Sequence, residues 1–132
     1  MRITIPGQTR AKKNGMAVIK MGPRYSLRPG KLYTQWEKAA LDHLIKENVQ
    51  PWQGGYPIEV CFFLFRDSRR RWDIDNVFCG TLDVLQQCRI IENDTMDHVI
   101  PIFSGWAISK DNPRVELLLR PITKPYFRED IS

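Results

Sequence analysis

The clearest fold signal in the chain is the stretch Ile58–Phe65, which reads IEVCFFLF. Its β-branched and aromatic residues favour a β-strand. The stretch is apolar on both faces towards its end, which is typical of a central strand that is covered on both sides. The chain then turns sharply polar at Arg66–Arg71, which reads RDSRRR. We therefore expect a buried strand that ends in an exposed and strongly basic loop.

One helix is expected before this strand and another after it. Thr34–Glu37, with the sequence TQWE, has the form of a capping box. The helix that follows this box is expected to run to about Asn48. The apolar spacing predicts a second helix over Asn76–Cys88.

Several shorter patterns predict the remaining strands. These are residues 1–5, a weak hairpin from Met16–Lys20 and Arg24–Leu27, the stretch Val99–Phe103, and a second hairpin from Ala107–Lys110 and Arg114–Leu119 around the turn at 111–113. The expected fold is α+β, with two helices packed on a mixed sheet of four or five strands. We expect a single domain over residues 1–122 and a loose C-terminal tail over residues 123–132.

The charge of the chain points weakly to a polyanionic partner. There are 20 Lys and Arg against 15 Asp and Glu among 132 residues, a formal net charge of +5. Residues 7–31 are rich in Gly, Lys and Arg, and no acidic residue precedes Glu37. Two interpretations stay open: a solvated loop, or a basic arm in which Arg10, Lys12 and Lys13 lie on phosphates.

The cysteines and the hydropathy limit the class of protein. The three cysteines are odd in number and form no CxxC pair, which favours a reducing, cytoplasmic environment over a disulfide framework or a zinc finger. No apolar run of about 18 residues exists, so no membrane span is expected. The opening sequence MRITIP turns polar too quickly for a signal peptide.

The stretch that indicates chemistry is RRRWDIDN, residues 69–76. Asp73 and Asp75 are two positions apart, and in an extended segment such residues project to the same side. There they would hold one Mg²⁺, with Mn²⁺ as a substitute, and the metal would polarise a scissile phosphate. Two structural alternatives stay open: an aspartate caps the following helix, or the arginines pair with the aspartates. If the aspartates hold a metal, the DNA backbone is held by Arg69, Arg70 and Arg71.

A second acidic group, Glu92-Asn93-Asp94, follows the second expected helix. A returning loop is expected to bring Asp94 beside Asp73 and Asp75 as a third carboxylate. The alternative is an acidic turn with a bend at this point. Carboxylates repel phosphate, so their presence beside a basic run favours a metal-dependent nuclease over a pure DNA binder.

The order of these motifs resembles the RusA family of Holliday junction resolvases. The resemblance rests on the Arg-rich run into Asp-x-Asp-Asn, the helix with Leu82–Leu85, LDVL, and the loop Ile90–Asp94, IIEND, and it covers roughly residues 1–120. It implies a homodimeric, Mg²⁺-dependent, structure-selective endonuclease of DNA recombination and repair that nicks two strands of a four-way junction symmetrically, often from a prophage. It assigns metal binding and catalysis to Asp73, Asp75 and Asp94.

Two positions depart from the family pattern. Asn93 stands where the family has an aspartate, and Cys79 stands where its best-known members have a catalytic lysine. Either Lys12 or Lys13 reaches into the site, or catalysis is weaker. A non-catalytic binder of branched DNA and a metal-dependent nuclease of other nucleic acids therefore stay open as alternatives. For the surface of a dimer we expect exposed apolar residues such as Phe103, Trp106 and Ile108.

Overall fold

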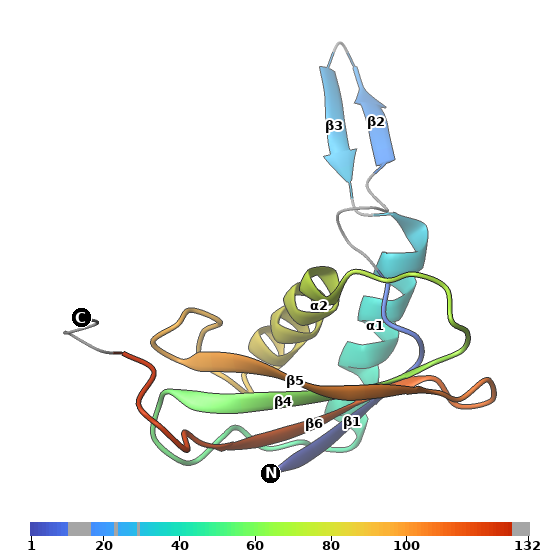
Figure 1. The fold of residues 1–132 in the computed structure, drawn as a ribbon. Coiled ribbons are helices and arrows are strands. Elements are labelled where there is room, and N and C mark those ends of the chain that lie inside the picture. The colour runs from blue at the N-terminus through green and yellow to red at the C-terminus, as the bar shows by residue number, and fades with distance from the viewer. Residues whose placement is uncertain (11–16, 23, 29, 128–132) are drawn as a thin grey trace, which may run out of the picture.

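The computed structural model describes residues 1–10, 17–22, 24–28 and 30–127. Figure 1 shows a four-stranded sheet with two helices on one face and a separate hairpin that projects beyond the helices. The predicted α+β fold, with two helices on a mixed sheet, is confirmed. No helix in these residues is long and apolar enough to cross a membrane. In chain order the elements are β1 (Arg2–Pro6), β2 (Ala17–Met21), β3 (Arg24–Arg28), α1 (Lys31–Lys46), β4 (Ile58–Arg66), α2 (Ile74–Gln87), β5 (Val99–Ile108) and β6 (Arg114–Pro121).

The strand β4 lies inside the sheet, as its sequence predicted. The strand order is β1-β6-β4-β5, with β4 antiparallel to β6 and parallel to β5. A parallel pair needs a long crossover connection, and α2 supplies it between β4 and β5. The helices cover only one face of β4, so Phe63 and Phe65 on the other face are half-buried rather than fully covered.

The expected hairpin around residues 111–113 is wrong. The segments on either side of this turn belong to β5 and β6, and β4 lies between them. The Ser109 N–H donates to the Arg66 carbonyl at 2.7 Å, so β5 follows β4 to its end before the chain crosses over. The two strands expected over Val99–Phe103 and Ala107–Lys110 merge into this one long strand.

A β-bulge explains how one strand spans both segments. The β4–β5 register shifts between Phe62 and Phe63, whose partners are Phe103 and Gly105, so Ser104 is the additional residue. Gly105 has φ +139°, and a Cβ at this position would lie 2.9 Å from the Phe63 ring. Glycine is therefore required here both by the backbone conformation and by the close approach.

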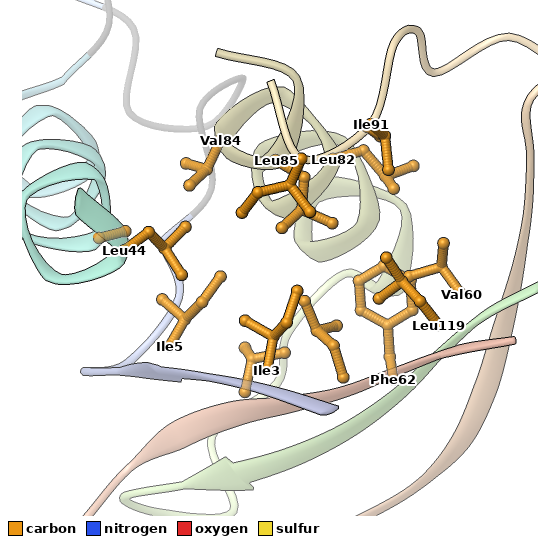
Figure 2. Packing of buried hydrophobic residues seen from close by; sticks show 14 of the residues in the cluster. Ile3, Ile5, Leu44, Val60, Phe62, Leu82, Val84, Leu85, Ile91 and Leu119 are labelled. Carbon is orange, nitrogen blue, oxygen red and sulfur yellow. The ribbon is translucent and has the colours of Figure 1, made fainter. Parts of the chain in front are cut away.

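The hydrophobic core lies between the helices and the sheet, as Figure 2 shows. Side chains of α1 and α2 point down onto alternate residues of the strands. The labelled members of this cluster are Ile3, Ile5, Leu44, Val60, Phe62, Leu82, Val84, Leu85, Ile91 and Leu119. Burying each such side chain stabilises the fold by about 1.5–3 kcal/mol, and the core therefore fixes how α2 sits on the sheet.

The predicted capping box is wrong, because α1 begins at Lys31 rather than after Thr34. Gly30 is the N-cap residue and makes no side-chain cap. The Thr34 hydroxyl instead donates back to the Gly30 carbonyl at 3.1 Å. Tyr33 is fully buried and lies one turn before the buried Trp36, on the same side of the helix. The helix therefore begins where its side chains start to pack on the core, earlier than the capping pattern indicates.

The chain after Pro121 is held to the sheet as far as Tyr126. Glu59 on β4 is fully buried and accepts hydrogen bonds from Arg120 (2.7 Å), from the Thr123 hydroxyl (2.9 Å) and from the Tyr126 hydroxyl. These bonds, that of Tyr126 above all, lower the pKa of Glu59 to about 2, against the opposing effect of burial. The expected tail over residues 123–132 is thus anchored in its first part, and residues 128–132 lie outside the described residues.

Candidate active site

Asp73 and Asp75 lie at the first residues of α2. Asp73 has an extended backbone, and its Oδ1 accepts the Asp75 N–H at 3.0 Å, so Asp73 is the N-cap of the helix. The helix begins at Ile74, two residues before the expected start. The capping alternative is thus confirmed, and the extended arrangement of the two aspartates is replaced by a cap and a first helical turn. Both side chains are exposed.

An aromatic cluster supports the residue before the cap. The Trp72 ring lies 5.9 Å from the ring of Phe103 and 6.1 Å from that of Trp106, both on β5. The guanidinium of Arg66 lies 5.5 Å from the centre of the Trp72 ring. Trp72 therefore packs against β5, whereas Ile74 is 37% exposed.

Two side-chain pairs join the loop after β4 to the start of the basic segment. Gln8 and Asp67 form a two-way clamp: the Gln8 amide donates to Asp67 at 2.8 Å, and the Asp67 N–H donates to the Gln8 oxygen at 2.7 Å. The hydrogen bond from the Gln8 amide to the Asp67 carboxylate is the main cause that lowers the pKa of Asp67. The buried Arg66 donates to the Thr9 hydroxyl at 3.2 Å. No local pattern indicates these contacts, because the partners are 57 to 59 residues apart.

The three arginines of the loop are exposed to solvent. In the part of the chain that the structure describes, no ion pair joins Arg69, Arg70 or Arg71 to Asp73. The surface-cluster alternative is therefore not found at Asp73, and the guanidinium groups can bind an external anion. Arg10 lies at the same end of the sheet, because it comes two residues after Gln8, which is bonded to Asp67. Its side chain is half-exposed.

The basic segment itself is described only in part. Lys12 and Lys13 lie outside the described residues, so the structure does not place them. The predicted weak hairpin is confirmed as β2 and β3, which pair from Ala17 with Arg28 to Met21 with Arg24. Figure 1 shows this hairpin leaving the body at the start of α1 and extending away from the sheet.

Asp94 lies beyond the opposite end of α2. Its N–H donates to the Asn93 side chain at 2.8 Å, and its own carboxylate is exposed. The loop is fixed at the start of β4, because the Glu92 N–H donates to the Tyr56 hydroxyl at 3.1 Å and the Ile58 N–H to the His98 carbonyl at 2.8 Å. Asn93 thus stabilises the turn, as the acidic-turn alternative expects.

The three predicted aspartates do not come together within one chain. The helix between them has 14 residues, which separates its two ends by roughly 20 Å. Figure 1 shows the loop after α2 and the loop before it at opposite ends of the sheet. Among the described residues no three His, Cys, Asp or Glu side chains are grouped closely enough to hold a metal. The expected return of Asp94 to Asp73 and Asp75 fails because α2 carries the chain back along most of the length of β4.

Cys79 lies one turn after Asp75 on α2 and is exposed. Next to it, Gly80 packs so closely that a Cβ there would lie 3.2 Å from the Tyr33 ring. Tyr33 donates to Glu37 at 3.1 Å, and burial followed by the charge of Glu37 raises its pKa. Tyr33 therefore stays protonated at neutral pH.

Exposed carboxylates beside exposed arginines are residue types that suit metal-assisted hydrolysis of a phosphodiester. Comparison with known families identifies the class of enzyme. The family model described as "Endodeoxyribonuclease RusA" matches residues 6–120, and the chain belongs to this family of endodeoxyribonucleases. A curated relative, the crossover junction endodeoxyribonuclease RusA of Aquifex aeolicus (strain VF5), is 29% identical over 92 residues, which cover 70% of this chain and 71% of the relative.

Proposed function

We propose that this chain is a Mg²⁺-dependent endonuclease that resolves four-way DNA junctions by paired, symmetric nicks. The observation that carries the proposal is the exposed pair Asp73 and Asp75 at the start of α2, directly after the exposed run Arg69–Arg71. The choice of junction DNA as substrate rests on the family and on the name of the relative, a crossover junction endodeoxyribonuclease.

The residues at the start of α2 suit Mg²⁺, and Mn²⁺ as a substitute. Mg²⁺ is usually held by one or two carboxylates, with waters and substrate phosphate as the other ligands. Asp73 uses Oδ1 for the cap, and its Oδ2 accepts no hydrogen bond from the described residues. A bound ion would supply charge stabilisation at the phosphate and a hydroxide at neutral pH. We assign this metal to Asp73 and Asp75.

The neighbouring residues bind and orient the DNA in this proposal. Arg69, Arg70 and Arg71 are exposed, and arginine binds phosphate with two parallel hydrogen bonds. The packing of the Trp72 ring against Phe103 fixes the backbone immediately before Asp73, so the carboxylate pair and the arginines keep their relative positions. We also assign Arg10, Lys12 and Lys13 to the DNA-binding surface.

A homodimer is part of the proposal, because one junction needs two coordinated cuts. A two-fold axis presents two identical sites to the two symmetric strands of a four-way junction. The residues expected at a dimer surface are exposed in the chain: Phe103 by 40%, Trp106 by 41% and Ile108 by 42%.

The proposed function is tested with a labelled synthetic four-way junction and a linear duplex of matched sequence, each with Mg²⁺ and with EDTA. We expect paired nicks across the junction only with Mg²⁺, and none on the duplex. Binding to the junction without cleavage in Mg²⁺ or Mn²⁺ would identify a non-catalytic binder of branched DNA. Equal cutting of the duplex, or no binding at all, would contradict the proposal.

A further inference from the structure

The row of β4 side chains that faces the helices ends in an arginine. Val60 and Phe62 of this row point into the core, as Figure 2 shows, and Leu64 is buried beyond them. Side chains alternate between the two faces along a strand, so Arg66 takes the next position on the helix side. Arg66 is only 7% exposed. A position in line with the core therefore holds a side chain that stays charged at neutral pH.

The guanidinium of Arg66 is bonded to uncharged groups. Its Nη1 donates to the Thr9 hydroxyl at 3.2 Å and to the Thr9 carbonyl at 3.4 Å. Within the residues that the structure describes, no carboxylate forms an ion pair with Arg66, and its buried Nε donates no hydrogen bond. Burial is the main cause that lowers the pKa of Arg66, against the opposing charge of Asp67. The positive charge is thus buried without a direct counter-charge in this part of the chain.

Stability alone does not account for an arginine at this position. Taking a charge out of water is costly, and an apolar side chain in place of a buried charge is often neutral or stabilising. The contacts of Arg66 instead lie on two segments of the proposed site. Thr9 directly precedes Arg10 of the basic segment. The Trp72 ring, whose centre lies 5.5 Å from the guanidinium, directly precedes Asp73. Arg66 therefore joins the start of the basic segment to the backbone that carries the carboxylates.

The shape of the guanidinium suits this double contact. The group is planar and delocalised, so one face can lie on an aromatic ring while its edge donates hydrogen bonds. A lysine ammonium is a compact point charge and does not present a flat face and a fork of donors together. The contacts of Arg66 with Trp72 and Thr9 therefore use the geometry of arginine as well as its charge.

We propose that Arg66 is a positioning residue of the nicking reaction, which holds Trp72 and Thr9 together so that Asp73 and the basic segment meet the DNA as one unit. Arg66 acts through these neighbours and is not itself a ligand of phosphate, because its side chain is buried. The inference rests on the proposed function, since it concerns the site at Asp73 and Asp75. A change at Arg66 should slow cleavage and leave the number of phosphate contacts as it is.

Arg66→Met tests this role, with Arg114→Met as the matched control. Arg114 also lies over an aromatic ring at the same end of the sheet, 3.6 Å from the centre of Phe65, but on the face that the helices do not cover. Arg114→Met is expected to nick the junction at the wild-type rate. Arg66→Met removes a buried charge together with its bonds to Thr9, so its Tm is expected to stay at or above that of the wild type. Its nicking rate at saturating junction is expected to fall about 10- to 100-fold, as for other groups that support metal ligands.

Two measurements in EDTA separate positioning from phosphate binding. A lost phosphate contact makes the slope of log affinity against log salt concentration shallower by about 1, so Arg66→Met should leave this slope unchanged. Amide hydrogen exchange over residues 72–77 should become faster in Arg66→Met, because the cap of α2 directly follows Trp72. A slope shallower by about 1 would make Arg66 a phosphate ligand and would overturn the inference. Unchanged exchange over residues 72–77 would do the same.

Two further variants test whether the contacts or the charge matter. Arg66→Lys keeps the charge and is expected to nick as slowly as Arg66→Met. Thr9→Val removes the hydroxyl that accepts from Arg66, so it should slow nicking in the wild-type chain and add little in Arg66→Met. Wild-type nicking by Arg66→Lys, additive effects of the Thr9 and Arg66 substitutions, or a slowing that only follows a loss of folded protein would each contradict the positioning role. If the wild-type protein does not cut the junction with Mg²⁺, the proposed function itself fails.

Discussion

Asp73 is assigned two roles, the cap of α2 and a ligand of the metal, and two substitutions separate them. Asp73→Asn keeps a side-chain oxygen for the Asp75 N–H, since Asn and Asp are about equally good N-caps. Asp73→Ala removes this bond and should lower the free energy of unfolding by about 1 kcal/mol, or the Tm by roughly 3 °C. Both substitutions remove the ligand charge, so both should slow cleavage by more than about 100-fold, because even outer-shell changes cost about 10- to 100-fold.

Three measurements on each variant decide between these roles: thermal unfolding, junction binding in EDTA, and the initial rate of nicking in Mg²⁺. Asp73→Asn should unfold like the wild type and bind the junction at least as tightly, because a negative charge near phosphate is gone. Wild-type cleavage by this variant would refute the metal assignment. A loss of stability equal to that of Asp73→Ala would refute the capping role.

Three further predictions concern DNA binding and stability. In EDTA, a plot of log junction affinity against log salt concentration should have a slope near −5, for about six phosphate contacts. Arg71→Ala should make this slope shallower by about 1. An affinity that does not change with salt would contradict DNA binding. The hydrogen bond from Tyr126, above the other bonds to Glu59, lowers the pKa of Glu59 from its ordinary 4.5 to about 2. The contribution of ionised Glu59 to stability is therefore complete above about pH 4.5 and is lost as the pH falls towards 2. Tyr126→Phe should reduce the shift of the urea midpoint over this pH range, and an unchanged shift would contradict the role of Tyr126. Gln8→Leu removes both bonds to Asp67 and should destabilise the chain by about 1–2 kcal/mol, with faster amide exchange over residues 67–72, whereas unchanged exchange would show that the clamp is not needed.

The elements with strong periodic patterns could be predicted from the sequence. The apolar run of β4 and the amphipathic spacing of α2 each depend on a few neighbouring residues, and both elements form close to where they were expected. The weak hairpin of β2 and β3 and the exposure of Phe103 and Trp106 were also predicted correctly. Local pattern is sufficient in these cases because the contacts that decide them are short in sequence.

Features that depend on partners far apart in sequence were not predicted. The turn at residues 111–113 looks like a hairpin, but the parallel pairing of β4 with β5 sends β6 to the other side of β4. The buried Tyr33 starts α1 before the capping pattern. The Glu59 cluster joins residues more than 60 positions apart, and nothing in either segment alone indicates it.

The candidate site was found as a motif but not as a geometry. The residue types of RRRWDIDN indicated phosphate and metal chemistry, and the structure leaves Arg69, Arg70, Arg71, Asp73 and Asp75 of this motif exposed. The predicted position of Asp94 is wrong because α2 separates this residue from Asp73 and Asp75. A helix of 14 residues rises roughly 20 Å, which is most of the length of the nine-residue strand that it follows, so a carboxylate after it lies at the other end of the sheet.

Paired cutting by the Asp73–Asp75 site is tested most directly on a supercoiled plasmid that extrudes a cruciform. Two nicks within one bound complex convert this plasmid to linear DNA, whereas independent single nicks first give relaxed circles. We predict linear product directly from the wild-type protein with Mg²⁺, and none with EDTA, with Asp75→Asn or on a plasmid without the cruciform. Relaxed circles alone, or linear product from Asp75→Asn, would contradict it.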